Sequence, residues 1–137
     1  MKVKQLDHLN LTVQSLDDSI AWYGRVFGFE KVEEGRRGGQ PWAILKSGEA
    51  LLCIYEGPTR KALDADALAD AGLHGMNHFA LRVTDRRGWL ETLARERLEF
   101  TYESPVEYPH STSWYVKDPT GYEIEVALWN NDQVDFA

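Results

Sequence analysis

Two histidines and one glutamate in this chain have the residue types and the spacing of a metal site. His8 and His78 lie 70 residues apart in two similar segments, residues 6–13 and 76–83, and Glu125 follows near the end of the chain. Two histidines and one carboxylate that converge leave coordination positions open for water, oxygen or substrate, and they suit Fe(II) or Mn(II). The residues therefore predict one divalent metal ion, for which Zn, Ni, Co and Mg are the alternatives.

Each of these residues also has an ordinary structural interpretation. A single histidine on a strand is more often hydrogen-bonded or solvated than a ligand, and a glutamate between apolar strand residues usually faces water. The repeat favours the metal interpretation, because it places His8 and His78 at equivalent positions and Glu125 on the closing strand. Cys53 occupies the corresponding position of the first half. We interpret it as a small buried residue, since a thiolate is unusual in a hard-metal site.

The two similar segments alternate apolar and polar residues, which predicts two half-buried strands. Their polar faces are expected to carry His8, Asn10 and Thr12 in the first half and His78, Ala80 and Arg82 in the second. A helix is predicted after each strand, with Ser15 and Asp85 as the N-caps. Gly28 is expected to end the first helix, and Trp89, Leu90, Leu93 and Leu98 form the apolar stripe of the second.

Three short strands are expected after each helix. They are predicted at residues 29–33, 42–46 and 50–55 in the first half and at 99–103, 113–117 and 123–128 in the second. The chain is therefore predicted to be an α+β protein of two tandem βαβββ modules, about 1–56 and 76–130. A linker, about 57–75, joins them and contains a short helix over 63–71. We expect the sheets to curl into one eight-stranded mixed-sheet cup within a single domain of residues 1–137.

Composition restricts the kinds of partner that this protein can have. The chain has 137 residues, 43% of them hydrophobic and 27% charged, which is typical of a globular domain. Its formal charge of −7 disfavours binding to nucleic acid. No apolar run approaches the roughly 18–20 residues that cross a membrane. One cysteine and the lack of a signal-peptide pattern lead us to expect a cytoplasmic protein, and a homodimer is the expected assembly.

Four segments together resemble the vicinal oxygen chelate superfamily, which includes glyoxalases, bleomycin-resistance proteins and extradiol dioxygenases. They are residues 6–13, 48–55, 76–81 and 118–125, so the resemblance covers nearly the whole chain. It implies a metal at the centre of a cup, chelating a small-molecule substrate through vicinal oxygens. His8, His78 and Glu125 resemble the ligand set of its extradiol catechol dioxygenases and its fosfomycin-resistance enzymes. Tyr115, ten residues before Glu125, matches a tyrosine of its extradiol dioxygenases and its fosfomycin-resistance enzymes.

The branches of the superfamily differ in the residues around these ligands. Glyoxalase I enzymes usually carry a glutamate where this chain has Cys53, and bleomycin-binding members generally lack the ligands. Fosfomycin-resistance enzymes bind phosphonate with basic residues near and after the last strand, whereas residues 128–133 contain none. The hydrolytic type uses a carboxylate base in the middle strands, and residues 40–44 contain no acidic side chain.

The resemblance therefore favours an extradiol-type dioxygenase that acts on a catechol-like aromatic compound. Tyr115 would hydrogen-bond a substrate oxygen and His110 would transfer a proton, although His110 lies a few residues later than the histidine of those enzymes. The residues expected to contact substrate are Trp42, Tyr55, Arg82 and Asn10, and Tyr108 and Trp114 are further aromatic candidates for the pocket wall. Ordinary packing is the alternative for each aromatic residue, and alternation prevents Trp114 and Tyr115 from sharing a face.

Two other functions stay open at this point. The chain could be another metal-dependent member, such as a glyoxalase-like lyase, an isomerase or an epoxide-opening transferase of the fosfomycin type. It could also be a non-catalytic small-molecule-binding resistance protein. Iron with O2 uptake favours the dioxygenase, activity with Mn, Ni or Co and no oxygen favours the second class, and a metal-free pocket favours the third. The site could form within one chain or between halves exchanged across a dimer.

Overall fold

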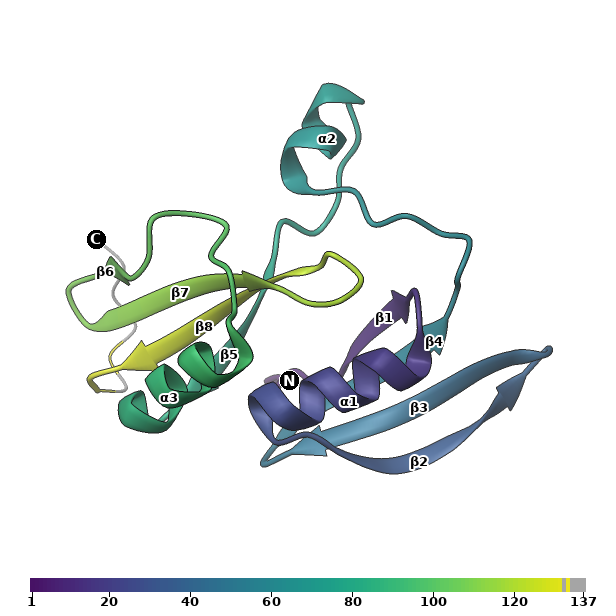
Figure 1. Cartoon of the computed structure of the whole chain (residues 1–137), viewed down its shortest axis with the longest axis horizontal. Helices are drawn as coiled ribbons and strands as arrows, with labels where there is room; N and C mark the ends of the chain where they lie inside the picture. Colours follow the sequence, from purple (N-terminus) through teal and green to yellow (C-terminus); the bar gives the residue numbers. More distant parts are fainter. Residues whose placement is uncertain (132, 134–137) are drawn as a thin grey trace. The chain divides into compact units, whose positions relative to one another are not determined.

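A computed structural model describes residues 1–131 and 133 of the chain. The chain divides into two compact units, Met1–Lys61 and Ala62–Ala137, and the division falls within residues 57–75. Each unit contains one four-stranded sheet with a helix on one of its faces (Figure 1). No helix in the described part of the chain is both long enough and apolar enough to span a lipid bilayer.

The first unit follows the predicted order of one strand, one helix and three strands. Its elements are β1 (Leu9–Val13), α1 (Leu16–Phe27), β2 (Glu30–Arg37), β3 (Gln40–Ser47) and β4 (Ala50–Glu56). The strands are ordered β1-β4-β3-β2 in the sheet, with β1 and β4 parallel and the other pairs antiparallel. The parallel pair requires a crossover connection, which α1 begins.

The second unit repeats this arrangement after one short helix. Its elements are α2 (Ala65–Asp70), β5 (Phe79–Val83), α3 (Arg86–Glu96), β6 (Val106–Glu107), β7 (Ser111–Lys117) and β8 (Glu123–Trp129). The strand order is β5-β8-β7-β6, again with one parallel pair, β5 and β8. The predicted α+β fold of two βαβββ modules is therefore confirmed. The joining of both sheets into one cup stays a prediction.

Each sheet packs one face against its helix, and we call the opposite face of each sheet its open face (Figure 1). In the first unit the buried side chains include Leu11 and Val13 of β1 and Tyr23 of α1. In the second unit Trp114 of β7 contacts Trp89 of α3, with ring centroids 6.2 Å apart. Because strand side chains alternate between faces, the residues on either side of Trp114 must lie on the opposite, open face.

Two predictions for the second unit are wrong. Residues 99–103 form no strand: Phe100 makes one isolated bridge to Val116, and the edge strand is the two-residue β6. The Thr101 amide donates to the Tyr115 carbonyl at 3.0 Å as part of this bridge, and Pro105, which follows the segment, has no backbone N–H to donate. Leu90, predicted in the apolar stripe of α3, is exposed.

Helices α1 and α3 are capped at equivalent positions by different residue types. The side chains of Ser15 and Asp85 accept hydrogen bonds from backbone amides three residues later, as predicted for N-caps. Gly28 ends α1 with φ 66°, in the left-handed region that glycine adopts without strain. Arg97 occupies the same position after α3, with φ 52°.

These two helix ends predict opposite effects of substitution on stability. Arg97→Gly should raise the free energy of unfolding by roughly 0.5–1 kcal/mol, because it removes the cost of a left-handed non-glycine residue. Gly28→Ala should lower it by about 1 kcal/mol, although the new methyl group would meet no close neighbour. Urea denaturation of both variants measures these changes. If both substitutions changed the free energy of unfolding in the same direction, the assignment of a left-handed helix end to both positions would be contradicted.

Candidate functional site

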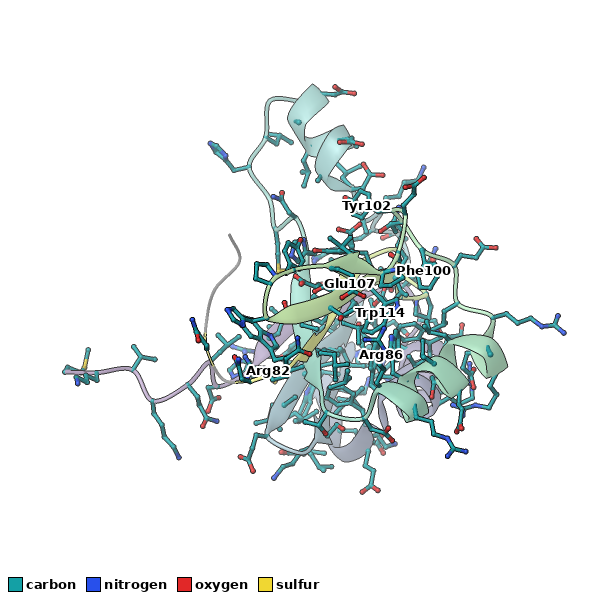
Figure 2. The ribbon with its side chains drawn as sticks, turned by 90° about the vertical axis from the view of Figure 1, so that its left-hand side faces the viewer. Arg82, Arg86, Phe100, Tyr102, Glu107 and Trp114 are labelled. Carbon is teal, nitrogen blue, oxygen red and sulfur yellow. The ribbon has the colours of Figure 1, made fainter. Side chains whose placement is uncertain are left out.

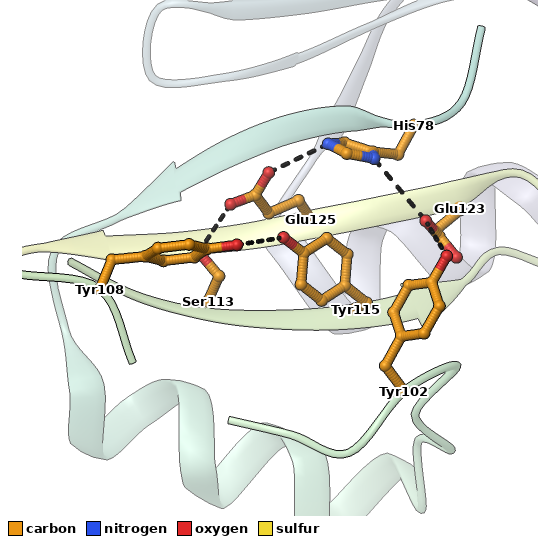
Figure 3. A network of polar contacts seen from close by, with 7 residues as sticks. All are labelled: His78, Tyr102, Tyr108, Ser113, Tyr115, Glu123 and Glu125. Atoms are coloured by element: carbon orange, nitrogen blue, oxygen red, sulfur yellow. Dashed lines mark hydrogen bonds and ion pairs between the residues drawn. The ribbon is translucent and has the colours of Figure 1, made fainter. Parts of the chain in front are cut away.

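His78 and Glu125 meet on the open face of the second sheet. His78 lies immediately before β5, and Glu125 lies on β8, the strand paired with β5. The Nε2 atom of His78 is 3.1 Å from Oε2 of Glu125 (Figure 3). Glu125 is buried, with 9% of its surface exposed, whereas His78 is about one third exposed. The sheet thus places a carboxylate and an imidazole side by side at a partly open position.

Ser113 contacts the other oxygen of the same carboxylate. Its hydroxyl donates a hydrogen bond of 2.6 Å to Oε1 of Glu125. Ser113 lies on β7, two residues before Tyr115, which is the direct partner of Glu125 in the antiparallel register. Because alternate residues share a face, Ser113 and Tyr115 both reach Glu125 from the same strand.

Tyr115 lies beside the His78–Glu125 pair. Its ring meets the His78 imidazole edge-on, with centroids 5.5 Å apart, and its hydroxyl is 3.4 Å from the hydroxyl of Tyr108 (Figure 3). Burial raises the pKa of Tyr115 above its ordinary value, and the hydrogen bond to Tyr108 and the charge of Glu125 raise it further. Tyr115 is therefore a neutral phenol at pH 7, able to donate a hydrogen bond.

The raised pKa of Tyr115 predicts a loss of stability at alkaline pH. Above the ordinary tyrosine pKa of about 10, the unfolded chain releases this proton while the folded chain keeps it, so the free energy of unfolding falls as pH rises. Tyr115→Phe should make the decline above pH of about 10 shallower than in the wild-type protein. Denaturant melts at neutral and alkaline pH measure the difference, and identical slopes would contradict it.

A second carboxylate, Glu123, faces the opposite edge of the same imidazole. Its Oε1 atom is 3.7 Å from Nδ1 of His78, too far for a direct hydrogen bond. The Tyr102 hydroxyl lies 3.5 Å from the same oxygen, and the charge of Glu123 is the main cause that raises the pKa of Tyr102. His78 is therefore flanked by one carboxylate on each side.

The His78–Glu125 pair fits two neighbouring ligands of one metal ion. Ligand atoms that lie at right angles around an ion, with bonds of about 2.1 Å, are roughly 3 Å apart. The 3.1 Å between Nε2 and Oε2 agrees with that separation. Among the residues that the structure describes, no three His, Cys, Asp or Glu side chains form a group that could hold a metal ion. The three-ligand set with His8 therefore stays a prediction.

His8 belongs to the first unit, where it lies immediately before β1, at the position equivalent to His78. Its Nδ1 atom is 2.8 Å from the carboxylate of Asp7, and its side chain is exposed. A carboxylate on one imidazole nitrogen directs the other nitrogen outward for binding. The local geometry of His8 is thus compatible with a ligand.

Three other predicted residues lie on the open face of the first sheet. Asn10 and Cys53 are neighbours on β1 and β4, and Trp42 and Tyr55 are neighbours on β3 and β4. The Trp42 ring lies against Gly35 of β2, where any Cβ atom would come within 2.6 Å of it. Asn10, Trp42 and Tyr55 therefore share one face of a sheet, as the alternation predicts.

Cys53 has the properties of a packed residue in this structure. It is half-buried, and burial, followed by the charge of Asp7, raises the pKa of its thiol. We expect Cys53→Ala to lower the free energy of unfolding by about 1 kcal/mol and to leave metal binding unchanged. Thermal melts and metal analysis of the variant check this. Loss of bound metal would show that the thiol is a ligand.

Arg82 and His110 lie on the second unit but not in the Glu125 cluster. The Arg82 guanidinium stacks over the ring of Trp129, 4.8 Å from its centroid. His110 precedes β7, and its imidazole lies 3.4 Å from the amide nitrogen of Asn131. The structure therefore brings His78, Glu125 and Tyr115 together and places Arg82 and His110 in other contacts.

The interpretation of Trp114 as a pocket residue is wrong. Trp114 is 2% exposed on the helix side of the sheet, where it contacts the Trp89 ring. The Arg86 guanidinium lies 5.5 Å from the centroid of the Trp114 ring (Figure 2). Sequence reasoning also missed Ser113, Glu123 and Tyr102. For Ser113 and Glu123 a signal existed, because each lies two residues from Tyr115 or Glu125 on an alternating strand.

Comparison with known proteins identifies the family to which this architecture belongs. Residues 5–126 match the model of the Glyoxalase/Bleomycin resistance protein/Dioxygenase superfamily. A catechol-2,3-dioxygenase of Bacillus subtilis (strain 168) is 27% identical over 134 residues, which cover 93% of this chain and 45% of that protein. The chain thus spans less than half the length of this relative.

Solved structures of the same fold match nearly the whole chain. A glyoxylase/bleomycin resistance protein/dioxygenase domain from Frankia sp. EAN1pec has a TM-score of 0.76 at 20% identity, with 96% of each chain covered. A glutamate-to-glutamine variant of the fosfomycin resistance protein FosX from Listeria monocytogenes, complexed with Mn(II) and dihydroxypropylphosphonic acid, has a TM-score of 0.69 at 18% identity, covering 95% and 94%. On its sequence match and its fold, the chain belongs to the Glyoxalase/Bleomycin resistance protein/Dioxygenase superfamily.

Proposed function

We propose that this protein is a divalent-metal-dependent enzyme that opens a catechol-like ring with O2, in the extradiol manner. His8, His78 and Glu125 would hold the ion, with Fe(II) or Mn(II) as the preferred metals. The observation that carries the proposal is the His78–Glu125 pair, with ligand atoms 3.1 Å apart beside the neutral phenol of Tyr115. The similarity to a catechol-2,3-dioxygenase supports the choice of reaction.

A divalent ion at this position would supply charge stabilisation to two adjacent substrate oxygens. Tyr115 would donate a hydrogen bond to one of these oxygens, because a tyrosine phenol carries its proton at neutral pH and its ring lies beside His78. Tyr108 would hold the Tyr115 hydroxyl in position through their 3.4 Å contact. The proton transfer assigned to His110 stays a prediction, since the imidazole lies beside Asn131.

The proposed substrate is a small aromatic molecule with two adjacent hydroxyl groups. Asn10, Trp42 and Tyr55 would contact it from the open face of the first sheet, and Arg82 would pair with an anionic substituent. We also propose that two copies of this chain form a homodimer. Ring opening consumes one catechol and one O2, and both oxygen atoms enter the product, so no further reductant is needed.

The test is oxygen uptake by protein loaded with a known metal. Metal-free protein is incubated anaerobically with Fe(II), Mn(II), Ni(II) or Co(II), and each sample receives catechol and O2 in an oxygen electrode. We expect uptake with Fe(II) or Mn(II) that matches the ring-opened product formed. Absence of uptake with every metal, together with lyase, isomerase or epoxide-opening activity, would replace the dioxygenase by the second enzyme class. Catechol binding to protein that binds no metal would support a non-catalytic binder instead.

A further inference from the structure

Ser113 makes a short hydrogen bond to the carboxylate of the candidate metal site. Its side chain is fully buried, and its hydroxyl donates to Oε1 of Glu125 at 2.6 Å. This distance lies in the range of O–H···O bonds to an ionised acceptor, which are stronger than bonds between neutral groups. Because Glu125 is itself buried, little water competes for this oxygen. The contact therefore restrains the rotation of the Glu125 carboxylate.

The restraint assigns different partners to the two oxygens of Glu125. Oε1 accepts the hydrogen bond from the Ser113 hydroxyl, and Oε2 lies 3.1 Å from Nε2 of His78 (Figure 3). An unrestrained carboxylate could turn either oxygen, or both, toward an ion, whereas a hydrogen bond to one oxygen favours ligation by the other. Partners of this kind orient metal ligands, and their loss typically weakens metal binding by roughly 10- to 100-fold.

We propose that Ser113 is a positioning residue, which holds Glu125 so that Oε2 alone faces the ion beside His78. This inference rests on the proposed function, because it assumes that Glu125 binds a metal. It adds a residue outside the three predicted ligands, and it specifies binding of the ion through one carboxylate oxygen.

The same strand supplies a matched control. Ser111 lies two residues before Ser113 on β7, so both side chains are on the open face of the sheet. Ser111 is equally buried, and its hydroxyl is among the buried atoms for which the structure shows no hydrogen-bond partner. Ser111→Ala and Ser113→Ala thus make one chemical change at two buried positions of one strand, and only Ser113 contacts Glu125.

The experiment measures Mn(II) affinity and folding of the full chain in parallel. Free Mn(II) is titrated by its electron paramagnetic resonance signal with wild-type protein, Ser113→Ala and Ser111→Ala, and circular dichroism melts follow each fold. We expect Ser113→Ala to raise the Kd for Mn(II) roughly 10- to 100-fold. Ser111→Ala should bind Mn(II) within about twofold of the wild-type protein, because no ligand depends on its hydroxyl.

Three outcomes would overturn the inference, and the measurements distinguish them. If the wild-type protein binds Mn(II) and Ser113→Ala binds it equally well, Ser113 does not position Glu125, and the proposed function stands. If both variants lose the same affinity, strand packing explains the loss. If the wild-type protein binds neither Mn(II) nor Fe(II), the proposed function fails and this inference fails with it. A Ser113→Ala protein with a melting curve like that of Ser111→Ala but weaker Mn(II) binding is the result that supports the assignment.

Discussion

Tyr115→Phe is expected to retain the bound metal and to lose roughly 10²- to 10³-fold in turnover, as is typical when a positioned hydrogen-bond donor to a reacting oxygen is removed. The change deletes only a hydroxyl, and that hydroxyl lies beside the His78–Glu125 pair without being one of the predicted ligands. Its ring should stay packed on His78 and Tyr102. Metal content by atomic emission and oxygen uptake with catechol measure the two effects separately.

Tyr102→Phe is the matched control for this prediction. Tyr102 stacks on the Tyr115 ring with centroids 5.3 Å apart, but its own hydroxyl points to Glu123 (Figure 3). It is exposed, so loss of its hydroxyl should change turnover far less than loss of the Tyr115 hydroxyl. Turnover of Tyr115→Phe equal to that of Tyr102→Phe would show that the Tyr115 hydroxyl does not assist the reaction as a hydrogen-bond donor.

Substituting alanine for any one of His8, His78 or Glu125 should remove most of the metal affinity. A three-ligand site that loses one protein ligand keeps too few donors for tight binding. The apo protein should still fold, because each sheet buries its own apolar face against a helix and does not depend on the ion, unlike a zinc finger. Metal titration and circular dichroism of the three variants measure affinity and fold.

The control for these variants is His110→Ala, whose imidazole lies beside Asn131 and outside the Glu125 cluster. It should bind metal like the wild-type protein. Full metal occupancy in one of the three ligand variants would exclude that residue from the site. Two such results would end the interpretation of His8, His78 and Glu125 as one ligand set.

Much of the fold follows from local patterns in the sequence. Strand alternation predicted that Leu11 and Val13 would be buried, and capping patterns predicted the starts of α1 and α3. These features depend on near neighbours in the chain. The edge strand β6 could not be placed this way, because its position depends on which short segment reaches β7 across the loop.

The candidate site was predictable in part for the same reason. The repeat and the family resemblance indicated His78, Glu125 and Tyr115, and the sheet register brings these three together. The hydroxyl of Ser113 could have been placed on the same face, but its 2.6 Å bond to Glu125 depends on the distance between β7 and β8. The partners of Arg82 and His110 also depend on side-chain packing, which alternation alone does not give.

Metal analysis of the unmodified protein tests the central claim most directly. The protein is purified without chelators, and its metal content is measured by atomic emission beside that of Glu125→Ala prepared in the same way. The proposed function predicts close to one divalent ion, Fe(II) or Mn(II), per wild-type chain and almost none in the variant. Wild-type protein that carries no divalent metal and binds none on titration would contradict it.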